Sequence, residues 1–78
     1  DYIELSEDFG ILDVPAPKSW QGKTIRELNV RAKLGVNIIA VENDGKTSVS
    51  PAADYVIQPG DTMVVLGDNI ALEKVQKL

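Results

Sequence analysis

The sequence has 78 residues, a formal net charge of −4, and neither cysteine nor histidine. A chain of this length forms one small domain, and the two missing residue types exclude disulfides, thiolate metal sites and the usual general base near neutral pH. No apolar run approaches the roughly 20 residues that cross a bilayer, so we expect no direct membrane insertion.

The amino-terminal end is acidic, and the first predicted strand follows it. We expect residues 1–10 to be a lead-in from an upstream domain and residues 11–78 to be the domain itself. The only methionine is Met63, which also fits a piece of a longer polypeptide. A short extended run that stops at Pro15 is indicated by three apolar residues, Phe9, Ile11 and Val14.

A helical segment is predicted to begin at Thr24. Glu27 follows three residues later, and this spacing fits a capping box, in which a hydroxyl and a carboxylate each cover a free backbone amide. Gly35 is a typical stop for a helix. Asn29-Val30 is weak in the middle of a helix, so we expect two short helical turns with a bend between them.

Short extended segments alternate with turns in the second half of the chain. Val36–Val41 is a continuous apolar run typical of a buried strand, and Asn43-Asp44-Gly45 after it is a turn signal. Further extended pieces are predicted at Lys46–Ser50, Tyr55–Ile57 and Thr62–Leu66, and a closing helix at Asn69–Leu78. With the short piece at Tyr55–Ile57 left out of the count, the order β-α-β-β-β-α indicates an α+β fold, with two helical segments packed on a small mixed or antiparallel sheet.

Basic residues gather in one part of this acidic chain. Residues 18–33 contain five of them against Glu27 alone: Lys18, Lys23, Arg26, Arg31 and Lys33. Such a cluster suits an anion, although a solvated helix face has the same composition. Because the whole chain has neither a basic excess nor an aromatic stacking platform, we expect no nucleic acid as a partner.

The sequence offers no group of side chains that a reaction needs. Its serines have no histidine to activate them, and 78 residues leave little room for a cleft between paired carboxylates. We therefore expect neither an enzyme nor a cofactor. A hard-cation site remains an alternative, beside the ordinary role of aspartate in turns, for Asp44, Asp54, Asp61 and Asp68.

Three segments together resemble a known family: Gly22–Leu28, Val30–Val41 and Val56–Gly67. Their order, with a helical segment, a Gly-Val-Asn-Ile-Ile-Ala strand and a Gly-Asp strand, resembles the C-terminal RCK domain, also called the TrkA-C domain, from about Ile11 to Leu78. The resemblance implies a regulatory domain of potassium channels, transporters or cation antiporters that forms homodimers. In Ktr-type members, cyclic di-AMP binds between the two copies and inactivates potassium uptake.

The resemblance also implies where the ligand binds. By position, the ligand-contacting pattern falls on Ile25, Asn29, Arg31, Asn37 and Ile38, and the homodimer forms through this site. The resemblance further implies a membrane-embedded potassium transporter or antiporter as the partner of the full-length protein. That partner would hold the chain in the cytoplasm, at the inner face of the cell membrane.

Ordinary structural roles are alternatives for the same residues. The two isoleucines are of a type that usually packs in a core. Arg31 is spaced to pair with Glu27 on a helix, and Asn37 follows Gly35 as turn residues do. For the whole chain, the alternatives are a structural dimerisation domain of a gating ring without a ligand, and a sensor of another small ligand or a cation.

Overall fold

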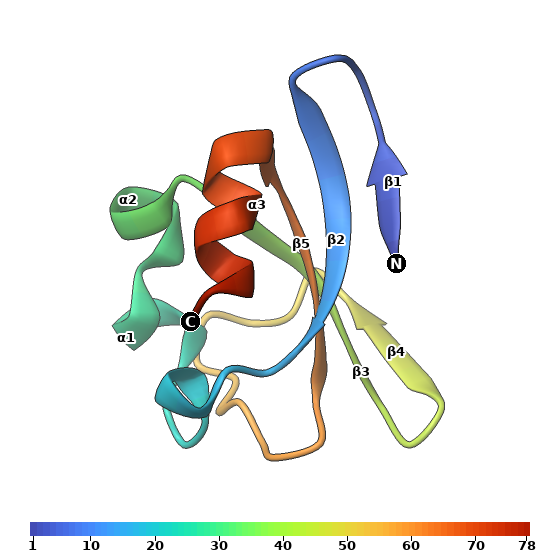
Figure 1. Ribbon diagram of the computed structural model, residues 1–78. Coiled ribbons are helices and arrows are strands. Elements are labelled where there is room, and N and C mark those ends of the chain that lie inside the picture. The colour runs from blue at the N-terminus through green and yellow to red at the C-terminus, as the bar shows by residue number, and fades with distance from the viewer.

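One sheet organises the computed structural model, which describes all 78 residues. Its five strands lie in the order β1-β2-β5-β3-β4, and every neighbouring pair is antiparallel (Figure 1). The strands are β1 (Tyr2–Glu4), β2 (Phe9–Pro15), β3 (Asn37–Asn43), β4 (Lys46–Val49) and β5 (Thr62–Asp68). The helices are the 3-10 turn η1 (Lys18–Trp20), α1 (Ile25–Leu28), α2 (Val30–Leu34) and α3 (Asn69–Gln76). The α-helices lie on one face of the sheet and leave the other uncovered (Figure 1).

Alternation along the two neighbouring strands β2 and β5 builds the core. Leu12 and Val14 on β2, and Met63 and Val65 on β5, are buried, whereas the residues between them are not. This follows from the two-residue period of a strand, which sends successive side chains to opposite faces. The buried face meets α3, whose inward residues are Ala71, Leu72 and Val75.

The structure confirms the predicted α+β fold and the antiparallel sheet. The first helical segment is divided into α1 and α2 by Asn29, which has a left-handed backbone conformation (φ 48°), so the predicted bend is present. The predicted turn between β3 and β4 is present too, with positive φ at Asp44 (53°) and Gly45 (74°). Two consecutive residues with positive φ form the type of tight turn whose twist matches that of the two strands in a hairpin.

The structure differs from the sequence-based expectation at two segments. Within the predicted lead-in, residues 2–4 form β1 and pair with β2, and residues 9–10 already belong to β2. Tyr55–Ile57 is not a strand, since Val56 makes only an isolated bridge to Thr24. Both differences have a tertiary cause. The Asn69 side chain holds β1 through Tyr2, and backbone hydrogen bonds to residues 22–25 hold the segment at 55–57.

Tyr2 shows how β1 is held against the rest of the fold. Its ring covers Gly10 so closely that a Cβ at Gly10 would collide with it, and its hydroxyl donates to Asn69 Oδ1 at 2.8 Å. The side-chain amide of Asn69 in turn donates to the backbone oxygen of Glu7 at 3.0 Å. The start of α3 therefore fastens the β1–β2 hairpin to the sheet.

Candidate functional site

The segment from Ile25 to Ile38 carries all five residues of the predicted ligand site. It begins with a capping box, because the Glu27 backbone N–H donates to Thr24 Oγ1 at 3.1 Å and the Thr24 backbone N–H donates to Glu27 Oε1 at 2.9 Å. These two bonds satisfy amides that the first turn of α1 leaves free. The backbone and side-chain hydrogen bonds from Thr24 also lower the pKa of the Glu27 carboxyl.

Asn29 sets the direction in which α2 leaves α1. Its backbone N–H donates to the carbonyl of Ile25 at 3.2 Å, and its own carbonyl accepts from the Lys33 backbone N–H at 3.0 Å. Its side-chain amide makes no capping hydrogen bond and is exposed. Asn tolerates the left-handed conformation better than most residues, because its short polar side chain fits there. The backbone of Asn29 thus forms the bend between α1 and α2, while its side-chain amide makes no capping hydrogen bond.

Arg31 is exposed on α2, and its guanidinium has no hydrogen-bond partner within the chain. The alternative of an ion pair with Glu27 requires a continuous helix between them. The left-handed residue Asn29 interrupts that helix, and Oε1 of the Glu27 carboxylate already accepts from the backbone N–H and the hydroxyl of Thr24. Arg31 therefore forms no ion pair with Glu27 in this structure.

Gly35 and Val36 turn the chain from α2 into β3. Gly35 adopts φ 78° and its N–H donates to the carbonyls of Val30 (3.0 Å) and Arg31 (3.2 Å), which ends the helix. Val36 is completely buried and lies against Gly67 of β5, where an added Cβ would approach Val36 Cγ1 to 2.9 Å. This close approach fixes the position at which β3 begins.

Asn37 and Ile38 are the first two residues of β3 and face opposite ways. Asn37 is exposed and pairs in register with Leu66, so it is a strand residue and not the turn residue considered above. Ile38 pairs with Val65 and packs against the core, as Ile25 does from α1, yet both remain half-buried. The two isoleucines therefore serve the core and still present apolar carbon at the surface.

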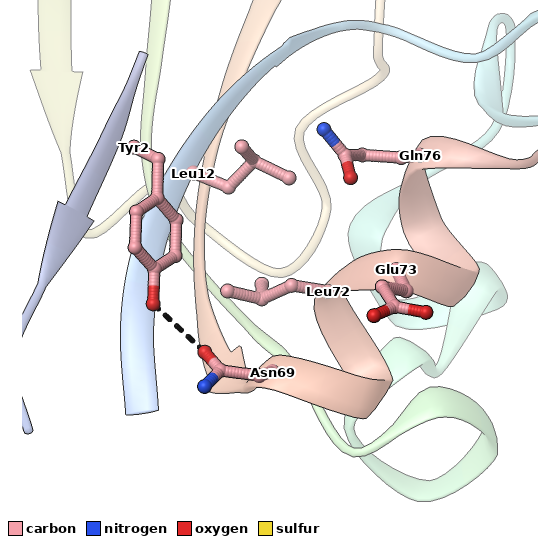
Figure 2. A pocket seen from close by; sticks show the side chains of 6 residues that line it. All are labelled: Tyr2, Leu12, Asn69, Leu72, Glu73 and Gln76. Atoms are coloured by element: carbon pink, nitrogen blue, oxygen red, sulfur yellow. Dashed lines mark hydrogen bonds between the residues drawn. The ribbon is translucent and has the colours of Figure 1, made fainter. Parts of the chain in front are cut away.

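None of the hollows on the chain is lined by these five residues. The three hollows lie near α3 and both ends of β2. One of about 300 Å³ lies between the β1–β2 hairpin and α3, and Figure 2 shows the Tyr2–Asn69 hydrogen bond across its edge. Its lining residues are Tyr2, Leu12, Asn69, Leu72, Glu73 and Gln76. A single copy of the chain therefore has a surface, and not an enclosed pocket, at the predicted site.

The loop between β4 and β5 forms backbone hydrogen bonds with the start of α1 and with the residues just before it. The backbone N–H groups of Ile25 and Arg26 donate to the carbonyls of Tyr55 (3.2 Å) and Ala53 (2.8 Å), and the Ile57 N–H donates to Lys23 at 2.9 Å. Sequence reasoning did not predict this contact. The one signal in the sequence was the extended piece predicted at Tyr55–Ile57, which is the segment that makes these hydrogen bonds.

Asp61 holds this loop and is 1% exposed. Its Oδ1 accepts from the side-chain amide of Asn43, and its Oδ2 accepts from the Tyr55 hydroxyl at 2.6 Å and the Gln58 backbone N–H at 2.9 Å. Burial raises the pKa of Asp61, but the hydrogen bonds from these three donors outweigh it and lower the pKa below its ordinary value. The hydrogen bond to Asp61, together with burial, raises the pKa of Tyr55 to about 12.

The same contacts bear on the cation alternative. Both oxygens of Asp61 face hydrogen-bond donors, which a cation would have to displace. Asp68 is the N-cap of α3 and accepts from the Ala71 N–H at 2.7 Å. No group of three or more acidic side chains in the chain is placed to hold a metal ion. Asp61 and Asp68 thus act through hydrogen bonds to groups of the chain.

Comparison with known proteins places this geometry in a family. The model of the TrkA-C domain matches residues 10–78. The chain belongs to the TrkA-C domain family. Among its relatives, the Ktr system potassium uptake protein C of Bacillus subtilis (strain 168) is 35% identical over 77 residues, which are 99% of this chain and 35% of that protein. The chain therefore spans about a third of the length of this relative.

Solved structures of the TrkA-C fold match the chain closely. The RCK C domain of the potassium transport protein KtrA, solved in complex with cyclic di-AMP, superposes with a TM-score of 0.80 at 28% identity, covering 86% of this chain and 79% of that one. The RCK_C domain dimer of S. agalactiae BusR in complex with cyclic di-AMP gives a TM-score of 0.76 at 32% identity, covering 86% and 91%.

Two further findings concern the expected partners. BusR has also been solved in complex with its busA-promotor DNA, so the expectation that no nucleic acid binds this TrkA-C chain stays a prediction. No helix of the chain has the length and apolar character needed to cross a membrane.

Proposed function

We propose that this chain is the regulatory domain of a potassium uptake or related cation transport system, and that it controls transport by binding cyclic di-AMP between two copies. The transporter or antiporter is then the membrane-embedded partner of the full-length protein. The chain itself works in the cytoplasm, at the inner face of the membrane. It has no catalytic role in this proposal.

The observation that carries the proposal is the exposed side chain of Arg31, which has no hydrogen-bond partner, in the same segment as the exposed side chains of Asn29 and Asn37. Cyclic di-AMP is a two-fold dianion, and a symmetric dimer offers it two copies of one surface. A guanidinium binds a phosphate through a planar fork of N–H donors. The guanidinium of Arg31 is available for this contact, because it is not paired with a carboxylate of its own chain. The exposed amides of Asn29 and Asn37 add donors for phosphate or ribose oxygens.

The apolar part of the site comes from Ile25 and Ile38. Each is anchored in the core and half-exposed, so each presents carbon against which an adenine face buries well. A surface without an enclosed hollow fits a site that a second copy completes. The relatives KtrA and BusR, whose domains were solved with cyclic di-AMP, support this choice of ligand.

Calorimetric titration of the chain with cyclic di-AMP tests the proposal. Binding is expected at or below tens of micromolar, the weak end of a useful sensor by the usual conversion of affinity to free energy. Arg31→Ala is expected to weaken it by about 2 kcal/mol, or roughly 30-fold, because a charged hydrogen bond is lost. Lys33→Ala removes the other exposed cation of α2 and is the matched control, with nearly unchanged affinity expected.

Two alternative functions are separated by the same titration. A structural dimerisation domain of a gating ring forms dimers but gives no heat with cyclic di-AMP at any concentration. A sensor of another small ligand or a cation gives a melting shift with that ligand alone. Equal loss of affinity in Arg31→Ala and Lys33→Ala would contradict the assigned role of Arg31, since it would show only a general effect of positive charge.

A further inference from the structure

The hollow between the β1–β2 hairpin and α3 has an apolar floor between two polar walls. Leu12 and Leu72, which are 5% and 3% exposed, form the floor. The Tyr2 ring lies on one side of these leucines, and Glu73 and Gln76 lie on the other (Figure 2). Small-molecule sites usually combine an apolar lining with a few polar groups, and the volume of about 300 Å³ suits a small ligand.

Two elements distant in sequence build the walls. Tyr2 pairs in register with Leu12, so both side chains point to the helical side of the sheet. On α3 the lining residues are three and four positions apart, which places them on one face of the helix: Asn69, Leu72, Glu73 and Gln76. The hydrogen bond from the Tyr2 hydroxyl to Asn69 joins the two walls, so the hollow is formed without a ligand.

The polar groups of the α3 wall are free to bind. The Glu73 carboxylate and the Gln76 side-chain amide are exposed, and neither forms a hydrogen bond within the chain. An ionised carboxylate only accepts hydrogen bonds, so Glu73 suits a cationic donor. An aromatic ring also attracts a cation that lies over its face, and the Tyr2 ring lines the opposite wall.

The surface around the hollow is acidic. Residues 1–17 contain no lysine or arginine. Several acidic residues belong to the lining or adjoin it along the chain or in register: Glu4, Glu7, Asp8, Asp68 and Glu73. Lys74 and Lys77 oppose this charge only in part, because two bases stand against these five acids. A concave surface with an excess of one charge raises the local concentration of ions of the opposite charge.

The lining suits an organic cation better than a metal ion. A hard cation such as Ca²⁺ takes six to eight oxygen ligands. Here one carboxylate lines the hollow, and no group of three or more acidic side chains is placed to hold a metal ion. The two buried leucines instead offer carbon against which an apolar stem leaves water.

We propose that this hollow binds a small organic cation, namely a protonated amine or a guanidinium on a short apolar stem. The stem lies against Leu12 and Leu72, and the charge lies between Glu73 and the Tyr2 ring. The same head group occurs on free metabolites and on lysine or arginine side chains of proteins. The inference does not depend on cyclic di-AMP, because none of the five residues of the proposed ligand site lines this hollow.

Titration of the isotope-labelled chain with butylguanidinium, followed by NMR, tests the proposal. The amide signals of Tyr2, Leu12 and Asn69–Gln76 are expected to shift and saturate, with a dissociation constant of about 1 mM or below at low ionic strength. Butylurea has the same shape without the charge and is the matched control. It is expected to bind about tenfold more weakly or worse, because the contacts with the carboxylate and with the ring both need the charge.

Two pairs of variants test the walls. Glu73→Gln removes the charge and keeps the shape, and it is expected to weaken butylguanidinium binding about threefold to tenfold, since water screens an exposed carboxylate. Glu42→Gln, the same change on β3 outside the hollow, is expected to leave the affinity unchanged. Tyr2→Leu is expected to weaken binding about twofold to fivefold, whereas Tyr2→Phe, which keeps the ring, retains most of the affinity.

A further probe distinguishes the two sources of the head group. N-acetylarginine methylamide presents a guanidinium on the stem that a protein side chain would offer. Tighter binding of this probe than of butylguanidinium supports a side chain of a partner protein as the natural ligand. Weaker binding of this probe supports a free small molecule.

Three results would overturn the inference. These are equal affinity for butylurea and butylguanidinium, equal affinity of the Glu73→Gln and Glu42→Gln variants for butylguanidinium, and the same signal shifts with potassium chloride at equal concentration. The dispersion of the amide signals establishes that each variant is folded before its affinity is compared. Because no cyclic di-AMP is present, each of these results leaves the proposed function untouched, and failure to bind cyclic di-AMP leaves the organic-cation site standing.

Discussion

Replacing Asp61 by alanine is expected to remove a large share of the stability of this domain. The carboxylate is 1% exposed and accepts from Asn43, Tyr55 and Gln58. A hydrogen bond to a charged group contributes about 1.5–3 kcal/mol, and an unsatisfied buried donor costs about 1–3 kcal/mol. Because the three donors lie on residues that are half-buried or exposed, water reaches them in part, so we expect about 3–4 kcal/mol in total.

This loss is large for a chain of 78 residues. At about 0.05–0.15 kcal/mol per residue, its free energy of unfolding is roughly 4–12 kcal/mol. Denaturant titration followed by fluorescence measures the change, because the single tryptophan, Trp20, is 3% exposed in the core and reports unfolding. Asp54→Ala, at an exposed aspartate of the same loop, is the control, with a change within about 0.5 kcal/mol. A loss below about 1 kcal/mol for Asp61→Ala would refute the hydrogen-bond account.

Three further predictions follow from single contacts. Because the folded pKa of Asp61 is lowered, the stability it contributes is present above about pH 4 and is lost as the pH falls below that value, so Asp61→Asn should flatten the acid limb of the unfolding curve. Because the pKa of Tyr55 is raised to about 12, its contribution is present below about pH 10 and is lost as the pH rises through 12. Tyr55→Phe should therefore lower the free energy of unfolding at pH 7 by about 1.5–3 kcal/mol and remove that alkaline loss. Gly10→Ala should displace the Tyr2 ring and break its hydrogen bond to Asn69, which destabilises the chain by about 0.5–1.5 kcal/mol, and the effect should disappear in a Tyr2→Ala background, as a double-mutant cycle by denaturation would show.

Local signals in the sequence predicted the elements that local chemistry decides. The capping box of Thr24 and Glu27 and the left-handed stop at Gly35 appear in the structure as their spacing indicates. The bend at Asn29 was predicted from low helix propensity, and it appears as a single residue with positive φ. In these cases a few neighbouring residues contain all the interactions that fix the backbone.

The sequence did not reveal features that depend on distant partners. β1 lies in a stretch whose acidic composition suggests a linker, and it is held by Asn69, 67 residues away from Tyr2. The segment at 55–57 is fixed by backbone hydrogen bonds to residues 22–25, 30 or more positions earlier in the chain, and these make only an isolated bridge and not a strand. That Ile11 and Leu66 lie side by side on the uncovered face of the sheet follows only from the register of β2 and β5, which are about 50 residues apart.

The positions of the candidate ligand residues could be predicted from the sequence. The contacts from the β4–β5 loop that hold these residues in place could not. Asp61 holds Tyr55, the Tyr55 carbonyl accepts from the Ile25 N–H, and Ile25 opens the helical turn that leads to Arg31. A variant of Asp61 should therefore weaken ligand binding only together with stability, because it acts through the position of α1. A variant of Arg31 should weaken binding while the free energy of unfolding stays unchanged, since its side chain makes no hydrogen bond within the chain. Measuring both quantities on both variants distinguishes a positioning residue from a ligand contact, and a stability loss in Arg31→Ala would contradict this division.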